Sequence, residues 1–462
     1  MTSKAVPRGG GPGDLRAGFA RVDITPLLSI PYLSYMPRQT AFEGVHDPLF
    51  ARAMVVGNGE TDLALIAVDA LGFSTDVLGP GRDFVAEVRA RVEVSTGIPG
   101  DHVMLAASHA HSTPQTTHIA RLLDFAAAGP WLEHLIDQLA SSVQHAQQRL
   151  RPAQLKGSTG QATGVAWSRR IVGDDGKLYR LPRPPARVRR DVRDEQVHVL
   201  VVQPMEASAE WRGVLCNFAC HPTTVQVQPL VSGDYPAYAC ALVERELPAG
   251  ACLFLQGACG DINPRRHTTD FEDVRIYGQI LGAEVLKQAA QLFAPEPSPM
   301  SSTLRAGRRV LRLPARPLPD RAPWAELFAS AESRVAQADS DETRRQAEGD
   351  LRRAREVLRL IDLGSDDVAC EIQVLRLGDA LVVGVPGELF CQFGLDLKAA
   401  SPAPITVIAA YANGYVGYLA GREDYDLGGY ETSLGPWTRL GPGATERLVD
   451  EAQSLMHEVW TG

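Results

Sequence analysis

The sequence has no long hydrophobic run. No stretch of its 462 residues approaches the roughly 18 uninterrupted apolar residues of a membrane span. The N-terminal sequence MTSKAVPRGGGPGDLRAG also has no apolar segment of the kind found in secretory signals. We therefore expect a cytoplasmic protein with no stable membrane association.

The sequence has no excess of positive charge. Its 46 Lys and Arg residues stand against 55 Asp and Glu residues, which gives a formal net charge of −9. This balance argues against nucleic acid or an anionic membrane as the main partner. Charged residues make up 22% of the chain and hydrophobic residues 45%, a composition typical of a globular protein rather than a disordered one.

Cysteine is scarce and odd in number. The seven cysteines stand mostly among small or apolar residues, as in CNFAC and GACLFLQGACG. In a reducing compartment this context predicts free buried thiols rather than a disulfide framework. Cys216 and Cys220 precede His221, but the spacing lacks a second Cys/His pair of the zinc-finger kind, so a thiolate metal site is not expected there.

Short apolar runs alternate with helical patterns along the chain. Runs such as GFARVDI, LALIAVDAL, HVMLAAS, VLCNFA and ALVVGV are typical of buried strands. Helical spacing places these residues on one face: Leu132, Leu135, Ile136, Leu139 and Val143. The alternation predicts an α/β fold of mixed β-sheets flanked by helices. We expect a flexible Gly-rich tail over residues 1–16 and a single domain over residues 17–462.

Residues 315–365 differ from the rest, because they carry two charged amphipathic stripes joined by a polar turn. This pattern predicts a helical hairpin that is inserted in the α/β body and ends at Gly364. The hairpin could act as a lid or form a contact in a homo-oligomer. An equally simple interpretation is a solvated spacer that covers the edge of a sheet.

Candidate metal ligands stand where apolar strands end. His109 and His111 follow HVMLAAS, and in an extended chain residues i and i+2 point to the same side, which suits a metal. His221 follows VLCNFA and Glu388 follows ALVVGV, and α/β folds place their chemistry at such strand ends. The alternatives are exposed histidines after a strand, a core histidine at position 221, and a helix-capping role for Glu388. Because 112 residues separate His109 from His221, spacing does not predict that they meet.

Two further segments suit a ligand site. In GDINP, Asp261 and Asn263 offer side-chain oxygens beside backbone N–H groups, although an ordinary Asx turn fits equally well. The run YANGYVGYLAGREDYDLGGYETSLGPWT is rich in tyrosine and glycine, a composition common in loops that line ligand sites.

Taken in order, SHAHSTP, FACHPTTV with SGDYPAYA, GDINP, VPGELF and NGYVGYLAGREDY resemble the motifs of the neutral/alkaline ceramidase family. The resemblance runs from GFARVDITP to SLGPWT and so covers most of the chain. It implies an α/β catalytic domain that binds one zinc ion through two histidines, a glutamate and a tyrosine. The matching residues are His109, His221, Glu388 and Tyr418. A slightly shifted alignment would place Tyr415 or Tyr425 in the last position.

The resemblance also implies roles for residues beside the metal. His111 or Tyr418 would hold the scissile carbonyl or the oxyanion that develops from it. Arg169 resembles the family's substrate-contacting arginine, and Arg170 is an equally close neighbour.

The identity of the general base is open in this comparison. Glu388 in an outer position, or Asp261 acting through a water, would take the proton. Three residues in family-like motifs could orient the ligands or serve only in strand-end hydrogen bonding: His46, Asp69 and Asp234.

The sequence departs from the family pattern at one chemically important position. The family's Gly-Asp-x-Ser-Pro motif carries a serine assigned as nucleophile, and this chain has Asn263 there. An amide side chain does not form an acyl-enzyme, so we expect attack by a zinc-activated water, with Asn263 donating a hydrogen bond to substrate. No segment matches the C-terminal β-sandwich of the secreted members, which favours a soluble substrate over ceramide in a membrane.

These observations predict a zinc-dependent amidohydrolase that cleaves the C–N bond of a soluble N-acyl or other amide substrate. Its partner would be a small-molecule amide or acyl compound and not a nucleic acid. One alternative is a zinc esterase or lactonase that uses the same site. Another is a non-catalytic zinc or small-molecule binding protein that has lost the family's serine.

Overall fold

The computed structural model describes residues 14–31, 41–180, 183–205, 213–247, 250–265, 267–268, 270–294, 298–364 and 366–462. The expected N-terminal tail lies outside this range up to residue 13, and the first strand begins at Arg16. Among the helices of the described ranges, none has both the length and the apolar character that a membrane crossing requires.

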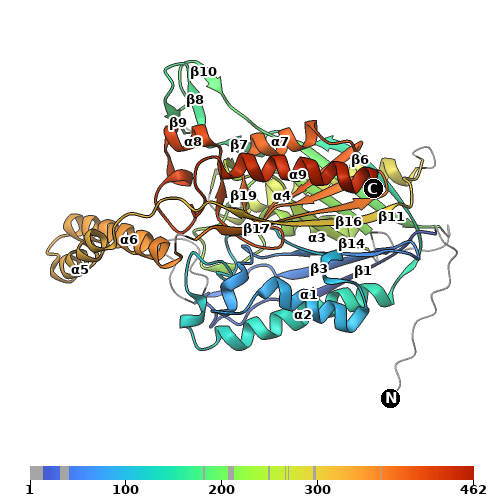
Figure 1. The fold of residues 1–462 in the computed structure, drawn as a ribbon, viewed down its shortest axis with the longest axis horizontal. Coiled ribbons are helices and arrows are strands. Elements are labelled where there is room, and N and C mark those ends of the chain that lie inside the picture. The colour runs from blue at the N-terminus through green and yellow to red at the C-terminus, as the bar shows by residue number, and fades with distance from the viewer. Residues whose placement is uncertain are drawn as a thin grey trace.

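Most strands belong to two sheets that share a core (Figure 1). In the described part of the chain the larger sheet has eight strands, in the spatial order β14 (Ala251–Gln256), β12 (Gly213–Phe218), β11 (Gln196–Pro204), β6 (Arg151–Gln161), β1 (Arg16–Asp23), β3 (Phe50–Gly57), β4 (Asp62–Val68) and β5 (Val103–Ala107). The smaller sheet has four: β16 (Leu304–Leu313), β17 (Val368–Leu377), β18 (Ala380–Gly384) and β20 (Ile405–Ala409). Strand pairs β4–β5, β12–β14 and β18–β20 are parallel and their other neighbours antiparallel, so both sheets are mixed, as predicted.

Successive residues of a strand enter different cores, because side chains alternate between the two faces of a sheet. On β18, Ala380 and Val382 belong to an inner core that both sheets share. Leu381 and Val383 belong to an outer core that the helices complete. Burial on both faces explains why these strands appear in the sequence as almost continuous apolar runs.

Helices cover the outer faces of the sheets (Figure 1). The strands β1 and β3 are covered by α2 (Ala128–Gln148), with α1 (Phe84–Thr96) packed beside it. The strands β14 and β11 are covered by α3 (Asp234–Glu246) and α4 (Phe271–Phe293), and β16 and β17 by α9 (Ala444–Thr461). Local signals set their ends. The Asp83 side chain accepts a hydrogen bond from Ala86 N at the start of α1, and Gly97 ends this helix with a φ of 75°.

Two helices, α5 (Arg321–Gln337) and α6 (Asp341–Asp362), pack on each other and project from the body at the left of Figure 1. They occupy the range for which the sequence predicts a hairpin. Helix α6 meets the body where Arg353 donates to Leu434 O at 2.6 Å and Arg359 donates to His118 O at 3.0 Å. A role as lid or oligomer contact stays a prediction.

Short strand pairs hold the segments around the candidate site. The shorter elements are β2 (Gly44–Val45) with β13 (Leu230–Val231), β7 (Ala166–Ser168) with β15 (Ile262–Pro264), β19 (Glu388–Leu389) with β21 (Tyr418–Leu419), the sheet of β8 (Ile171–Gly173), β9 (Leu178–Tyr179) and β10 (Val188–Arg190), and the helices α7 (Cys391–Ala399) and α8 (Arg422–Leu427). Pairing of β15 with β7 sets Asn263 opposite Trp167, two residues before Arg169. Pairing of β19 with β21 sets Glu388 opposite Tyr418. Residues expected to act together are thus joined by backbone pairing.

Candidate active site

Apart from Arg169, which follows the short strand β7, the candidate residues lie in segments that follow β5, β12, β14, β18 and β20 at their carboxyl ends. Backbone hydrogen bonds tie these loops to one another. His111 N donates to Pro222 O at 3.2 Å, and Gly260 N donates to Leu389 O at 2.8 Å. Segments far apart in the sequence therefore form one site, as the strand-end positions suggested.

The centre of this site consists of His109, His221 and Glu388. His221 Nε2 lies 3.0 Å from Glu388 Oε2, and His109 Nε2 lies 3.5 Å from the same oxygen. None of the three side chains is more than 4% exposed. His111 is half-buried and brings its Nε2 to 3.2 Å from His109 Nε2. The ligand atoms of the three histidines all lie within 4.8 Å of one another, close enough to hold one metal ion.

Backbone carbonyls fix the orientation of two of these imidazoles. His109 Nδ1 lies 2.6 Å from Leu71 O, and His221 Nδ1 lies 2.6 Å from Cys259 O. Since a carbonyl only accepts, each Nδ1 carries the proton and each Nε2 presents a lone pair. Two lone pairs then face a carboxylate oxygen with no proton between them, an arrangement that a cation would stabilise. Imidazole nitrogens with a carboxylate are a donor set that zinc prefers.

Burial and neighbouring charges set the protonation of this centre. Burial, helped by the Arg169 guanidinium, lowers the pKa of His221 to about 4, so the imidazole is neutral near pH 7. Burial opposes the ionisation of Glu388, but positive charge on the facing imidazoles, first that of His109, would hold the pKa of its carboxyl well below its usual range. His221 is therefore in the neutral form that binds a metal, and a cation held between the imidazoles and Glu388 would keep the carboxylate charged.

His109 and His111 meet through a tight turn and not through an extended strand. Strand β5 ends at Ala107, and His109 has a φ of 65°, in the left-handed region. The expectation that the two imidazoles share one side of a strand is therefore wrong in its reason, although the rings do meet. The His109 ring also stacks on Tyr411 with 4.0 Å between ring centroids, and Tyr411 has a φ of 56°. Such conformations are unusual for residues other than glycine and cluster at functional sites.

Arg169 joins three groups at the edge of the buried centre. Its guanidinium donates to the Tyr418 hydroxyl at 2.8 Å, to Gly260 O at 2.6 Å and to Asn263 Oδ1 at 3.2 Å. Because Asn263 Oδ1 accepts from Arg169, its amide N–H groups are the donors that a substrate oxygen could use. Arg169 and Asn263 are both half-buried. They therefore lie between solvent and the three buried ligands.

The structure separates the two adjacent arginines that the sequence left as alternatives. Arg170 forms ion pairs with Glu431 at 2.8 Å and with Asp424 at 3.4 Å. It contacts these acids and not Tyr418 or Asn263 in any hydrogen bond between described residues. Arg169 is therefore the arginine of the candidate site.

The three candidate tyrosines have different partners. Tyr425 donates to Leu440 O at 2.7 Å. Tyr415 donates to Glu388 Oε1 at 2.5 Å, whereas the Tyr418 hydroxyl accepts from Arg169. Tyr415 and Tyr418 thus both belong to the site, and Tyr425 is held elsewhere.

Asp261 lies beside Arg169, at the start of helix α7. Its Oδ1 accepts a hydrogen bond from Cys391 N at 2.7 Å, and its backbone carbonyl accepts from Arg169 N at 2.9 Å. Burial raises the pKa of its carboxyl from 3.8 to about 6. The side chain therefore caps α7 and also titrates close to the range useful for a general base.

We expect the Asp261→Asn variant to be more stable than the parent at neutral pH. Because the folded pKa is raised, the native state favours the protonated acid, and that contribution is lost as pH rises from about 3.8 through about 6. Asparagine stays neutral and can still accept from Cys391 N. The variant should gain up to about 3 kcal/mol in unfolding free energy above this interval, and the gain should vanish toward its lower end.

Urea unfolding at about pH 5 and about pH 8 measures this difference. The matched control is Asp366→Asn, because Asp366 is exposed. A gain of the same size at both pH values would contradict the explanation by burial.

Three residues that could have oriented the ligands contact other groups. Asp69 forms an ion pair with Arg52 at 2.9 Å. Asp234 accepts hydrogen bonds from neighbouring backbone N–H groups. His46 stacks on Phe271, with 3.5 Å between ring centroids. These contacts agree with a structural role for the three residues rather than with a role in orienting the metal ligands.

Several groups of the site were not predicted from the sequence. The carbonyls of Leu71 and Cys259 orient the imidazoles, and a backbone group has no side-chain signature. Glu431 lies 2.9 Å from Arg169 Nε, and only its place in the Gly- and Tyr-rich run hinted at a role. Tyr430, from the same run, packs edge-on against Tyr418 with 6.0 Å between ring centroids.

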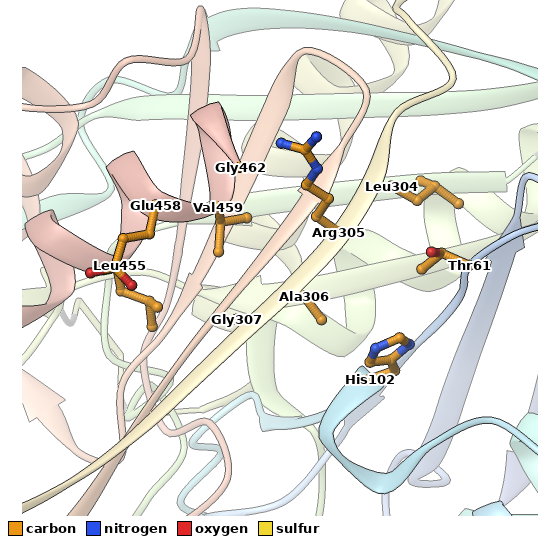
Figure 2. Close-up of a pocket in the computed structure, with 10 residues that line it drawn as sticks. All are labelled: Thr61, His102, Leu304, Arg305, Ala306, Gly307, Leu455, Glu458, Val459 and Gly462. Atoms are coloured by element: carbon orange, nitrogen blue, oxygen red, sulfur yellow. The ribbon is translucent and has the colours of Figure 1, made fainter.

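Figure 2 shows a separate groove of about 400 Å³ between β16 and α9. Its lining includes His102, Arg305 and Glu458, and none of its lining residues belongs to the candidate site. The chemistry-bearing residues and this groove are therefore distinct features of the molecule.

Comparisons with known proteins agree with the resemblance seen in the sequence motifs. Residues 15–300 match the family model of the neutral/alkaline non-lysosomal ceramidases, N-terminal region. Neutral ceramidase of Pseudomonas aeruginosa is 23% identical over 500 aligned residues, which cover 95% of this chain and 72% of that protein.

Two solved structures share the fold. The crystal structure of neutral ceramidase from Pseudomonas aeruginosa has a TM-score of 0.69 at 21% identity, over 97% of this chain and 75% of that one. A structure of ceramidase complexed with C2 has a TM-score of 0.67 at 19% identity, over 97% and 76% of the two chains. The predicted fold class is thus confirmed.

Proposed function

Since the chain belongs to the neutral/alkaline non-lysosomal ceramidase family of hydrolases, we propose that it is a zinc-dependent amidohydrolase acting on an N-acyl or other amide substrate. The observation that carries the proposal is the buried meeting of His109 Nε2, His221 Nε2 and Glu388 Oε2, with both Nδ1 atoms held by carbonyls. We propose that these three residues and Tyr418 bind one zinc ion per chain, with His111 beside it.

Zinc bound there would polarise the scissile carbonyl and lower the pKa of a water to about 7. The remaining tasks fall to the chain's own residues. His111, half-buried at the edge of the centre, would donate to the oxygen that becomes negative. Arg169 would hold the Tyr418 hydroxyl in place and keep the Asn263 amide turned so that its N–H groups face the substrate.

A general base is needed to take the proton from the attacking water. Asp261 suits this task, because burial raises its pKa to about 6. Its Oδ1 is occupied by Cys391 N, so the other carboxylate oxygen would act, through a water. Loss of hydrolysis in Asp261→Asn together with the expected gain in stability would support this assignment.

We expect Asn263→Ser to be a poorer enzyme than the parent. Serine removes the amide N–H donor and shortens the side chain that accepts from Arg169. One hydrogen bond contributes about 1–1.5 kcal/mol, so kcat/KM should fall about tenfold. Steady-state kinetics of Asn263→Ser and Asn263→Ala measure this loss. A serine variant as active as the parent, or more active, would count against a specific need for the amide.

The proposed function is tested with matched pairs of substrates that carry the same acyl group on an amine or on an alcohol. We propose soluble N-acyl compounds as substrates, and a short-chain ceramide belongs in the panel because the relatives are ceramidases. Release of free amine that depends on added zinc is the expected result. Turnover of esters alone would favour a zinc esterase or lactonase. Stoichiometric zinc binding without any hydrolysis would favour a binding protein.

A further inference from the structure

Three cysteines form a second cluster of metal-ligating atoms, apart from the candidate active site. Cys216 lies on β12, Cys240 on α3 and Cys252 on β14. Their sulfur atoms all lie within 4.8 Å of one another, and Cys216 Sγ is 3.8 Å from Cys252 Sγ. The three side chains are at most 1% exposed.

The fold explains why these cysteines meet. Strands β12 and β14 pair in parallel, with Val214 opposite Cys252 and Cys216 opposite Phe254. Cys216 and Cys252 therefore point to the same face of the sheet, as diagonal neighbours. Helix α3 packs on this face beside β14 and adds Cys240. The sequence does not show this cluster, because its three members come from three different elements.

The geometry favours a bound ion over a disulfide. All three cysteines are free thiols, with no sulfur–sulfur bond between them. Sulfur ligands about 2.3 Å from a common ion are about 4 Å from one another. The distance of 3.8 Å between Cys216 Sγ and Cys252 Sγ is close to this separation of two sulfur ligands.

The charges around the cluster are already balanced. Arg52 interacts electrostatically with Cys240 and forms ion pairs with Asp69 and Glu244. Glu244 also pairs with Arg21. Two cations thus offset two carboxylates in these pairs. If one thiol loses its proton to solvent and its thiolate binds a monovalent cation, with the other two sulfurs as neutral donors, this dry region gains no net charge, whereas an unpaired charge there would be costly.

We propose that Cys216, Cys240 and Cys252 bind one soft, thiophilic cation, for which monovalent copper is the best match. Thiolate ligands select soft ions such as Cu(I) and Zn²⁺. The cluster offers three sulfur ligands where structural zinc usually takes four. The bound ion would join α3 to β12 and β14. The inference does not depend on the proposed hydrolase activity.

The test uses the whole protein, to which one equivalent of zinc is added once it is purified so that the histidine centre is occupied. Copper is supplied during expression, because the cluster is closed to solvent, and again after purification as Cu(I) in its bicinchoninate complex. We expect the parent to hold about one copper per chain with a sulfur-only copper K-edge spectrum. Cys240→Ala should bind copper at least about tenfold more weakly. The control Cys370→Ala, which also removes a buried thiol, should bind it like the parent.

Either of two results would overturn the proposal. The first is a folded parent that binds no copper or binds it through nitrogen and oxygen ligands. The second is a Cys240→Ala variant with the copper affinity of the parent. If Cys240→Ala does not fold, the K-edge spectrum of the parent alone decides the question.

Discussion

Replacement of His221 by alanine is expected to abolish zinc binding and to lower amide hydrolysis at least about 1,000-fold. His221 Nε2 lies 3.0 Å from Glu388 Oε2, and its Nδ1 is held by Cys259 O. Removal of an outer partner of a metal ligand typically costs 10–100-fold in metal affinity or activity. Loss of a direct ligand should cost more, because it also leaves the buried Glu388 carboxylate with one partner fewer.

The matched control for this experiment is His198→Ala. His198 is also buried, and its Nδ1 pairs with Thr159 Oγ1 at 2.9 Å, away from the candidate site. Zinc per chain is measured by elemental analysis and folding by circular dichroism. A folded His221→Ala protein that still holds one zinc as tightly as the parent would remove His221 from the proposed ligand set.

Substitutions at the adjacent Arg169 and Arg170 are expected to affect different properties, activity at position 169 and stability at position 170. Lysine at position 169 keeps the charge but cannot reproduce the planar guanidinium that binds Tyr418, Gly260 and Asn263 together. We expect kcat/KM of Arg169→Lys to fall about 100-fold, the size of effect found when one preorganised donor of an active site is lost. The folded structure should persist.

Arg170→Met should instead unfold easily. Arg170 and Glu431 have side chains that are each only 1% exposed. Removal of one partner of a buried ion pair costs about 3–5 kcal/mol, because it leaves the other charge uncompensated. Urea unfolding and steady-state kinetics on both variants separate the two roles. A catalytic loss at Arg170 without a loss of stability would contradict the assignment.

Much of the fold was predictable from the sequence because the strands are buried on both faces. Runs such as LALIAVDAL and ALVVGV correspond to β4 and β18. Strand β6 was not predicted, since its sequence RPAQLKGSTGQ is polar and rich in glycine. Strand β6 forms because every residue of β11 pairs with it. Such tertiary pairing leaves no local signal in the sequence.

The site was predictable in its components and not in its geometry. His109, His221 and Glu388 each stood at the end of an apolar run, yet 167 residues separate His221 from Glu388. The order of the family motifs, and not their spacing, indicated that they act together, and the family model over residues 15–300 confirms the resemblance. The choice between Arg169 and Arg170 required the structure, because consecutive residues differ only in the direction of their side chains.

The measurement that tests the central claim most directly is amide hydrolysis by the parent protein before and after metal removal, with elemental analysis of the same samples. We predict that activity and zinc content fall together to background when a chelator is applied. Both should return together when about one equivalent of zinc per chain is added. Undiminished hydrolysis by a metal-free protein would contradict the account.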